Sequence, residues 1–293
     1  MAPEFSEKGL FEVLEPASQT LPLVFNSPHS GRAYPQGFIR DSRLDAHSIR
    51  RSEDHYVDEL FGAATELGAP MLLAHFPRAF LDVNREPYEL DPRMFEGSLP
   101  PYANVSSMRV AGGLGTVPRV VAENMEIYQR RMPVSEALER IETIYKPYHA
   151  CLRSLIVRTH LKFGFAVLVD CHSMPGNIRI AGGEKPDFII GDRYGTSAAG
   201  DLSRAVVRLF EDMGFVVARN KPYAGGFITE HYGRPAKGLH AIQIEVNRAL
   251  YVDETTLRKK PEFEAVRAGI AWALAELSGY VEKYASDSAL AAE

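Results

Sequence analysis

Cysteines are few in this sequence, and it lacks long apolar runs and a signal-peptide core. The two cysteines, Cys151 and Cys171, cannot build a disulfide framework or a multi-cysteine metal site. No stretch reaches the roughly 18 consecutive apolar residues that a transmembrane helix needs. Residues 1–21 are acidic and lack the apolar core of an export signal. We therefore expect a cytoplasmic protein with reduced thiols and no membrane association.

The charge balance argues against a nucleic-acid partner. The chain has 33 Lys and Arg residues against 38 Asp and Glu residues, a formal net charge of −5, and no basic run. A hydrophobic share of 45% and a length of 293 residues are enough to bury a core with a recessed site. Since we find no internal repeat and no linker, we expect a single domain over residues 1–293, with its core at about 20–284.

Predicted strands alternate with predicted helices along the chain. Apolar runs predict strands at 21–27, 71–76, 165–169, 188–190, 215–218 and 240–246. Helical spacing predicts helices at 41–67, 121–163, 197–213 and 255–284. This alternation is typical of an α/β fold with a mostly parallel or mixed sheet and helices on both faces. Ligands in such folds bind beyond the carboxyl ends of the strands.

Residues 86–120 contain many prolines and glycines and show little periodicity. Long loops without secondary structure are uncommon in compact domains and often cover a binding site. We predict either a loop that folds over the substrate, with Tyr102 as a contact, or a surface excursion without function.

Two histidines follow predicted strands, His29 in Pro-His-Ser-Gly and His172 in Asp-Cys-His-Ser. One histidine at a strand end is more often structural, but two beside small residues favour a metal site. A catalytic zinc ion usually has three protein ligands and one open position. The segment Ser-Glu-Asp-His-Tyr at 52–56 offers a third ligand. Periodicity does not choose between Glu53 and Asp54, and the segment also fits the solvated face of a helix.

The segment from Arg78 to Arg85 reads Arg-Ala-Phe-Leu-Asp-Val-Asn-Arg. Asp82 can accept a hydrogen bond from the second ring nitrogen of a ligating histidine, or it can cap a turn. Arg78 and Arg85 can bind carboxylates or polarise a carbonyl oxygen, because the guanidinium group suits planar anions. Surface ion pairs with nearby glutamates are the alternative.

Glu245 alternates with apolar residues on the predicted strand 240–246, so it shares one face with Gln243 and Asn247. It can act as a general base, or it can face solvent on an edge strand. Cys171 adjoins His172, but consecutive strand residues point to opposite faces, which argues against a cysteine nucleophile. Gly225 and Gly226 lack the strand–turn–helix context of a phosphate-binding loop.

Six blocks of this sequence resemble the N-formylglutamate amidohydrolase family, in the same order from about residue 20 to 275. The blocks are Asn26–Gly31, Ser52–Leu60, Arg78–Arg85, Asp170–Met174, Gly191–Arg193 and His240–Glu254. The resemblance implies a three-layer α/β fold with a mixed sheet and helices on both faces, of the phosphorylase/hydrolase-like class of zinc carboxypeptidases. Aspartoacylases are similar in the block with two arginines and in the later glutamate.

The resemblance implies a zinc-dependent hydrolase that cleaves N-formyl-L-glutamate to L-glutamate and formate, a step of histidine degradation. By that likeness, one Zn²⁺ ion is held by His29, Asp54 and His172, with Asp82 supporting His29. Glu245 is the base and Arg78 stabilises the oxyanion. The substrate, a small anionic N-acyl amino acid, is bound by Asn84, Arg85, Arg179 and Arg193, with Arg234 a further candidate. One departure is that Arg32, three residues after His29, replaces the glutamate of the carboxypeptidase His-x-x-Glu ligand pair.

Two other functions fit the same residues. A related N-acyl amino acid hydrolase or carboxypeptidase differs little, because one methyl group in a pocket changes binding by only about 1–3 kcal/mol. A solute-binding or regulatory protein on the same scaffold predicts the loss of the base or of a metal ligand, and Glu245, His29 and His172 are all present. The sequence predicts no oligomeric state. Residue spacing alone does not choose among Asp54, Glu53 and His55 as the third ligand.

Overall fold

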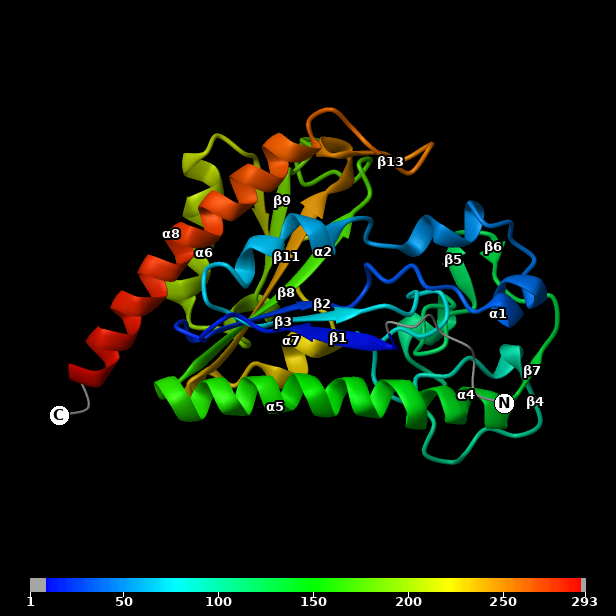
Figure 1. Cartoon of the computed structure of the whole chain (residues 1–293). Helices are drawn as coiled ribbons and strands as arrows, with labels where there is room; N and C mark the ends of the chain where they lie inside the picture. The colour runs from blue at the N-terminus through cyan, green and yellow to red at the C-terminus, as the bar shows by residue number, and fades with distance from the viewer. Residues whose placement is uncertain (1–8, 291–293) are drawn as a thin grey trace. The chain divides into compact units, whose positions relative to one another are not determined.

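A computed structural model describes residues 9–290 of the chain, with side chains to residue 284 (Figure 1). Contacts between Cα atoms divide these residues into two compact units. Unit 1 contains residues 9–12, 28–53 and 73–152, and unit 2 contains residues 13–27, 54–72 and 153–290. The single domain expected from the sequence stays a prediction.

A mixed sheet of seven strands is the largest sheet in the described part of the chain, in the order β1-β3-β2-β8-β11-β9-β10. β2 and β11 run parallel to β8, β9 runs antiparallel to β11, and β10 runs parallel to β9. The strands are Phe11–Leu14 (β1), Leu23–Ser27 (β2), Met71–Ala74 (β3), Ala166–Met174 (β8), Phe188–Gly191 (β9), Val217–Arg219 (β10) and Leu239–Asn247 (β11). The predicted α/β class with a mixed sheet is confirmed, and the likeness to carboxypeptidases stays a prediction.

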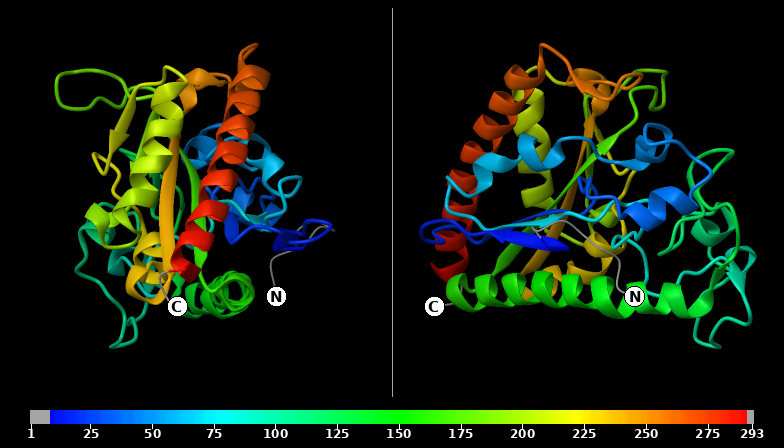
Figure 2. Two further views of the ribbon diagram at one scale, coloured as in Figure 1. Left: turned by 90° about the vertical axis from the view of Figure 1, so that its left-hand side faces the viewer. Right: turned by 45° about the vertical axis from the view of Figure 1, so that its right-hand side comes forward.

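The central strand β8 is buried at all nine positions. Its side chains point alternately to the two faces, so both faces must be covered. Accordingly, α2 and α7 both contact β8, and they lie on opposite sides of it in Figures 1 and 2. On β9, Phe188 stacks on Phe210 of α6 with ring centroids 4.1 Å apart, which anchors that helix to the sheet.

The helices α6 and α8 of unit 2 are longer than α2 and α7 and pack on each other. α6 contacts both β9 and α8. None of the helices in the described residues is long and apolar enough to span a membrane. The helices and short strands of unit 2 are Val57–Leu60 (α2), Gly62–Ala64 (η2), Arg193–Gly195 (η5), Gly200–Asp212 (α6), Phe227–Tyr232 (α7), Pro235–Lys237 (η6), Arg248–Leu250 (η7), Val252–Asp253 (β12), Arg258–Lys259 (β13) and Phe263–Leu290 (α8).

The predicted continuous helix at 41–67 is wrong, because the chain there forms only the short helices Ser48–Ser52 (η1), α2 and η2, with non-helical residues between them. Glu53 is extended and Tyr56 has a φ of 60°, so no continuous helix can pass through them. Glu53, Asp54 and His55 are buried, so the alternative of a solvated helical face is wrong. Long-range polar contacts of these residues, described below, hold the backbone in this form.

Unit 1 contains mostly short elements, and the predicted loop at 86–120 is largely irregular. The predicted helix at 121–163 begins only at Val134, because β5 and β6 form a hairpin before it. Pro133 directly precedes the helix, as expected because proline lacks the backbone N–H that a helix interior requires. Its elements are Gln36–Asp41 (α1), Ser48–Ser52 (η1), Pro92–Met94 (η3), Phe95–Glu96 (β4), Met108–Ala111 (α3), Val120–Ala122 (β5), Met125–Glu126 (β6), Met132–Pro133 (β7), Val134–Arg140 (α4), the π-helical turn Ile141–Tyr145 (η4) and the first residues of Lys146–Phe163 (α5).

Candidate metal centre

His172 lies on β8 two residues after Asp170, so both side chains share one face of the sheet. The His172 ring lies 2.9 Å from Asp170 Oδ2 through Nε2 and 2.9 Å from Asp54 Oδ2 through Nδ1. Asn26 on β2 donates to Asp170 Oδ1 at 2.7 Å. These four residues are at most 3% exposed. The imidazole ring is therefore held between two buried carboxylates, one of which is itself fixed by an amide.

The two carboxylates also control the protonation of this ring. Burial alone would lower the pKa of His172, but the charges and hydrogen bonds of Asp170 and Asp54 hold that pKa well above its usual value. A metal ion bound at Nδ1 would have to displace the proton that His172 shares with Asp54.

The structure separates the alternatives for a third ligand. Arg50 donates to both carboxylate oxygens of Glu53, at 2.9 and 3.0 Å, and Tyr34 Oη donates to Glu53 Oε1 at 2.7 Å. Glu53 is thus engaged by a cation and a phenol. The group of described residues able to ligate a metal contains Asp54 and neither Glu53 nor His55.

Glu245 lies beside His172 in the sheet. The parallel register of β11 and β8 pairs Glu245 with His172 and Gln243 with Asp170. Paired residues on neighbouring strands point to the same face of the sheet, so the Glu245 and His172 side chains lie on one face. Gln243 Nε2 donates to Glu245 Oε1 at 2.9 Å, and Gln243 Oε1 accepts from the Gly226 amide at 2.9 Å. β11 is an interior strand and Glu245 is only 8% exposed, so the alternative of a solvent-facing edge strand is wrong.

Cys171 is buried on β8, and its thiol donates to the Val169 carbonyl at 3.5 Å. Burial and the neighbouring charge of Asp170 raise the pKa of this thiol well above its usual value. A thiol that resists ionisation is a poor nucleophile, which supports the argument against a cysteine enzyme.

His29, in unit 1, follows β2 by two residues and is 1% exposed. Its Nε2 lies 2.8 Å from Asp82 Oδ1. A Cβ atom on Gly31 would lie 2.0 Å from the Phe76 carbonyl oxygen, so only glycine lets the backbone after His29 approach this closely. The carboxylate and the close backbone contact together fix the position of the His29 ring.

Asp82 gathers three positively charged or donating groups besides His29. Arg78 Nε donates to Asp82 Oδ2 at 2.9 Å, and Arg85 Nη2 lies 3.6 Å from the same oxygen. The backbone N–H of Asn84 donates to Asp82 Oδ1 at 2.8 Å. Burial raises the pKa of Asp82, but the charges of Arg85, His29 and Arg78 outweigh it and hold the pKa well below its usual value. Both arginines therefore face a buried carboxylate.

Side chains from the helical segment α4–η4–α5 hold the backbone around Asp82. Arg140 donates to the Phe80 carbonyl at 3.0 Å, Tyr145 to the Arg85 carbonyl at 2.6 Å, and a His149 ring nitrogen lies 2.8 Å from the Val83 carbonyl. The π-helical turn at 141–145 begins directly after Arg140 and ends at Tyr145; such turns occur frequently at functional sites. A segment without regular secondary structure is thus held at three carbonyl groups.

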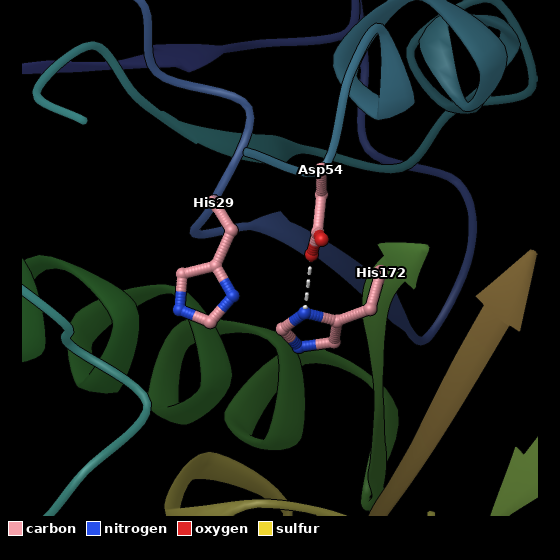
Figure 3. A group of neighbouring side chains, drawn as sticks. All are labelled: His29, Asp54 and His172. Carbon is pink, nitrogen blue, oxygen red and sulfur yellow. Dashed lines mark hydrogen bonds and ion pairs between the residues drawn. The ribbon is translucent and has the colours of Figure 1, made fainter. Parts of the chain in front are cut away.

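The three predicted metal ligands lie close together. Ligand atoms of His29, Asp54 and His172 are all within 4.8 Å of one another, and the three side chains are buried (Figure 3). Nε2 of His29 faces Asp82 and Nε2 of His172 faces Asp170, both outside this group, whereas Nδ1 of His172 faces Asp54 within it. Two imidazoles and one carboxylate form a donor set typical of catalytic zinc. The residues present therefore fit a divalent metal ion.

The remaining predicted site residues have other surroundings. Asn84 is buried. Arg193 Nη2 lies 2.7 Å from Glu230 Oε2. Arg179 is exposed. Tyr102 is 61% exposed and packs against Tyr88. Sequence reasoning missed Asp170 as the partner of His172, although the spacing of two residues on a strand already places both on one face.

Comparisons with known proteins identify the family. The sequence profile of N-formylglutamate amidohydrolase matches residues 21–252. The chain is 30% identical to an N-formylglutamate deformylase of Pseudomonas putida over 239 residues, 80% of this chain and 83% of the relative. It is 29% identical to an N-formylglutamate deformylase of Pseudomonas aeruginosa over 253 residues, 83% of this chain and 86% of the relative.

Solved structures agree with this likeness. The crystal structure of N-formylglutamate amidohydrolase from Ralstonia eutropha JMP134 superposes with a TM-score of 0.88 at 33% identity, covering 94% of this chain and 99% of that one. A gene product of Agrobacterium tumefaciens shares the fold, with a TM-score of 0.65 at 20% identity over 94% of this chain and 95% of that one. The chain belongs to the N-formylglutamate amidohydrolase family.

Proposed function

We propose that this protein hydrolyses N-formyl-L-glutamate to L-glutamate and formate with the help of one Zn²⁺ ion. The names of its relatives support the substrate. The observation that carries the chemistry is the register of Glu245 with His172, since it sets a carboxylate beside a buried donor set. In a cell this hydrolysis would serve histidine degradation.

His29, Asp54 and His172 would hold the metal ion. When bound, such an ion lowers the pKa of a coordinated water to about 7 and polarises the carbonyl oxygen of the substrate. Asp82 and Asp170 orient the two imidazole rings, each from the nitrogen that faces away from the metal position.

Glu245 is the general base of the proposed reaction. It takes a proton from the attacking water, whose oxygen forms a bond to the formyl carbon. The bond between that carbon and the amide nitrogen then breaks, and Glu245 returns the proton to the leaving nitrogen. The hydrogen bond from Gln243 fixes one carboxylate oxygen of Glu245 and would thereby orient this carboxylate for the reaction.

The arginines supply the positive charge that an anionic substrate requires in a chain of net charge −5. Arg78, whose Nε is bound to Asp82, would stabilise the developing oxyanion with its terminal nitrogens. Asn84 and Arg85 would bind one substrate carboxylate. Arg179 and Arg193 are candidates for the second, and Arg193 would then exchange Glu230 for the substrate.

The test is formate release from N-formyl-L-glutamate, measured before and after chelation and again after zinc is added back. We expect chelation to abolish turnover and zinc to restore it. N-acetyl-L-glutamate should react about 10–200-fold more slowly, the discrimination that one methyl group allows. Chelator-resistant turnover would contradict the metal, and a preference for the acetyl substrate would instead identify a related N-acyl amino acid hydrolase.

Replacement of Asp170 by Asn should weaken zinc binding about 10–100-fold, because the amide no longer supports the basicity of the His172 ring. Competition titration against a chromophoric chelator measures this. Asp187→Asn is a matched control, since Asp187 accepts a backbone hydrogen bond from Val216 elsewhere in unit 2. Equal zinc affinity in folded Asp170→Asn and wild-type protein would contradict the role of Asp170.

A further inference from the structure

Arg248 is a buried cation in unit 2 that the proposed mechanism leaves without a role. It begins η7 directly after β11 and is 8% exposed. The preceding residue, Asn247, fixes the backbone there: its side chain accepts from the Ala249 amide at 2.9 Å and donates to the Pro186 carbonyl at 2.8 Å. Burying a guanidinium group is costly unless it is paired, so its partners indicate its purpose.

Those partners are Ser173 and the proposed ligand Asp54. Arg248 Nε donates to Ser173 Oγ at 3.0 Å, and Nη2 donates to the Ser173 carbonyl at 3.3 Å. The same Nη2 lies 3.5 Å from Asp54 Oδ1, to which Ser173 Oγ also donates at 3.4 Å. The rigid, planar guanidinium group thus bridges the backbone of β8 and one oxygen of Asp54.

These contacts divide the two oxygens of Asp54 between separate tasks. Oδ1 faces Arg248 and Ser173, whereas Oδ2 faces the Nδ1 atom of His172. A carboxylate held at one oxygen cannot rotate freely, so Oδ2 stays directed at the metal position. Asp54 is only 1% exposed, and Arg248 pairs this buried carboxylate with a cation.

We infer that Arg248 is a positioning residue that holds Asp54 as a single-oxygen ligand for the metal ion. This inference rests on the proposed function, because it assigns Arg248 to the metal site proposed there. A purely structural ion pair would affect the stability of the fold and leave the zinc affinity of the folded protein unchanged.

Zinc affinity of the folded protein distinguishes these two roles. Competition titration against a chromophoric chelator would be applied to wild type, Arg248→Met and Arg248→Lys, with folding checked by circular dichroism. We expect Arg248→Met to raise the zinc dissociation constant about 10–100-fold, the usual effect of losing a partner of a metal ligand. Arg248→Lys should raise it less, because lysine keeps the charge but cannot form the bridge.

Arg119→Met is the matched control, since Arg119 donates to the buried Asp91 at 2.9 Å and that carboxylate is outside the ligand set. Its zinc affinity should equal that of wild type. The absorption spectrum of the cobalt-substituted protein should change in Arg248→Met and not in this control.

The inference is overturned if the Arg248 variants that fold bind zinc as wild type does, or if Arg119→Met weakens binding equally. Should Arg248→Met fail to fold, the affinity of Arg248→Lys decides. Wild-type protein that binds no zinc would overturn the proposed metal centre itself, a result distinct from unchanged affinity in the variants.

Discussion

Glu245→Gln should lower kcat for formate release by about 10²–10⁴-fold, the range that general-base catalysis contributes. Glutamine has nearly the same shape and can still bind the neighbouring Gln243, but it cannot take a proton from the attacking water. Because Glu245 is outside the ligand set, the variant should bind zinc with wild-type affinity. Steady-state kinetics and a zinc titration on the same preparation measure the two quantities.

Glu254→Gln is a suitable control for this experiment. Glu254 accepts a hydrogen bond from the Gly176 amide at 2.9 Å in unit 2 and lies outside the proposed catalytic group. It should leave kcat within a factor of a few. Near-wild-type turnover by Glu245→Gln would remove the general base from the mechanism. If the wild-type protein shows no hydrolysis and neither substitution has an effect, the result would favour a binding protein on this scaffold.

Local apolar runs predicted the sheet well, since six predicted strands each overlap a strand of the structure. β1 was missed because Phe11–Leu14 is short, contains the acidic Glu12 and is only half-buried, which gives a weak signal. The helix predicted at 41–67 failed for a different reason. Its periodicity was real, but partners far away in the sequence, such as His172 for Asp54, override local helical preference.

The candidate site was only partly predictable from spacing. Alternation on one strand correctly grouped Gln243 with Glu245, and the same rule applied to β8 would have found Asp170 beside His172. Spacing alone left Asp54, Glu53 and His55 open as the third ligand, and no periodicity reveals that Glu53 is engaged by Arg50. Packing between strands that are distant in sequence decides such contacts.

Asp82→Ala should destabilise the protein by about 3–5 kcal/mol, the usual cost of removing one partner from a buried ion pair. Arg78 and Arg85 would lose their common carboxylate, and the Asn84 amide would lose its acceptor. Denaturant unfolding of the metal-free protein measures this loss apart from zinc binding. Glu142→Ala removes the exposed ion pair with Lys146 in unit 1 and should cost less than about 1 kcal/mol.

The effect of Asp82 should also depend on pH with a defined sign. The pKa of Asp82 is held well below its usual value in the folded protein, whereas in the unfolded chain it is about 3.9. The carboxylate therefore contributes its full stability above pH of about 4, and this contribution declines as the pH falls toward the folded pKa. The difference in unfolding free energy between wild type and Asp82→Ala should accordingly be constant at neutral pH and shrink in acid.

A difference that stays constant or grows in acid would mean that Asp82 is not stabilised as an anion. The two arginines and His29 would then owe their positions to the surrounding backbone, which is held by Arg140 and its neighbours on the α4–α5 segment.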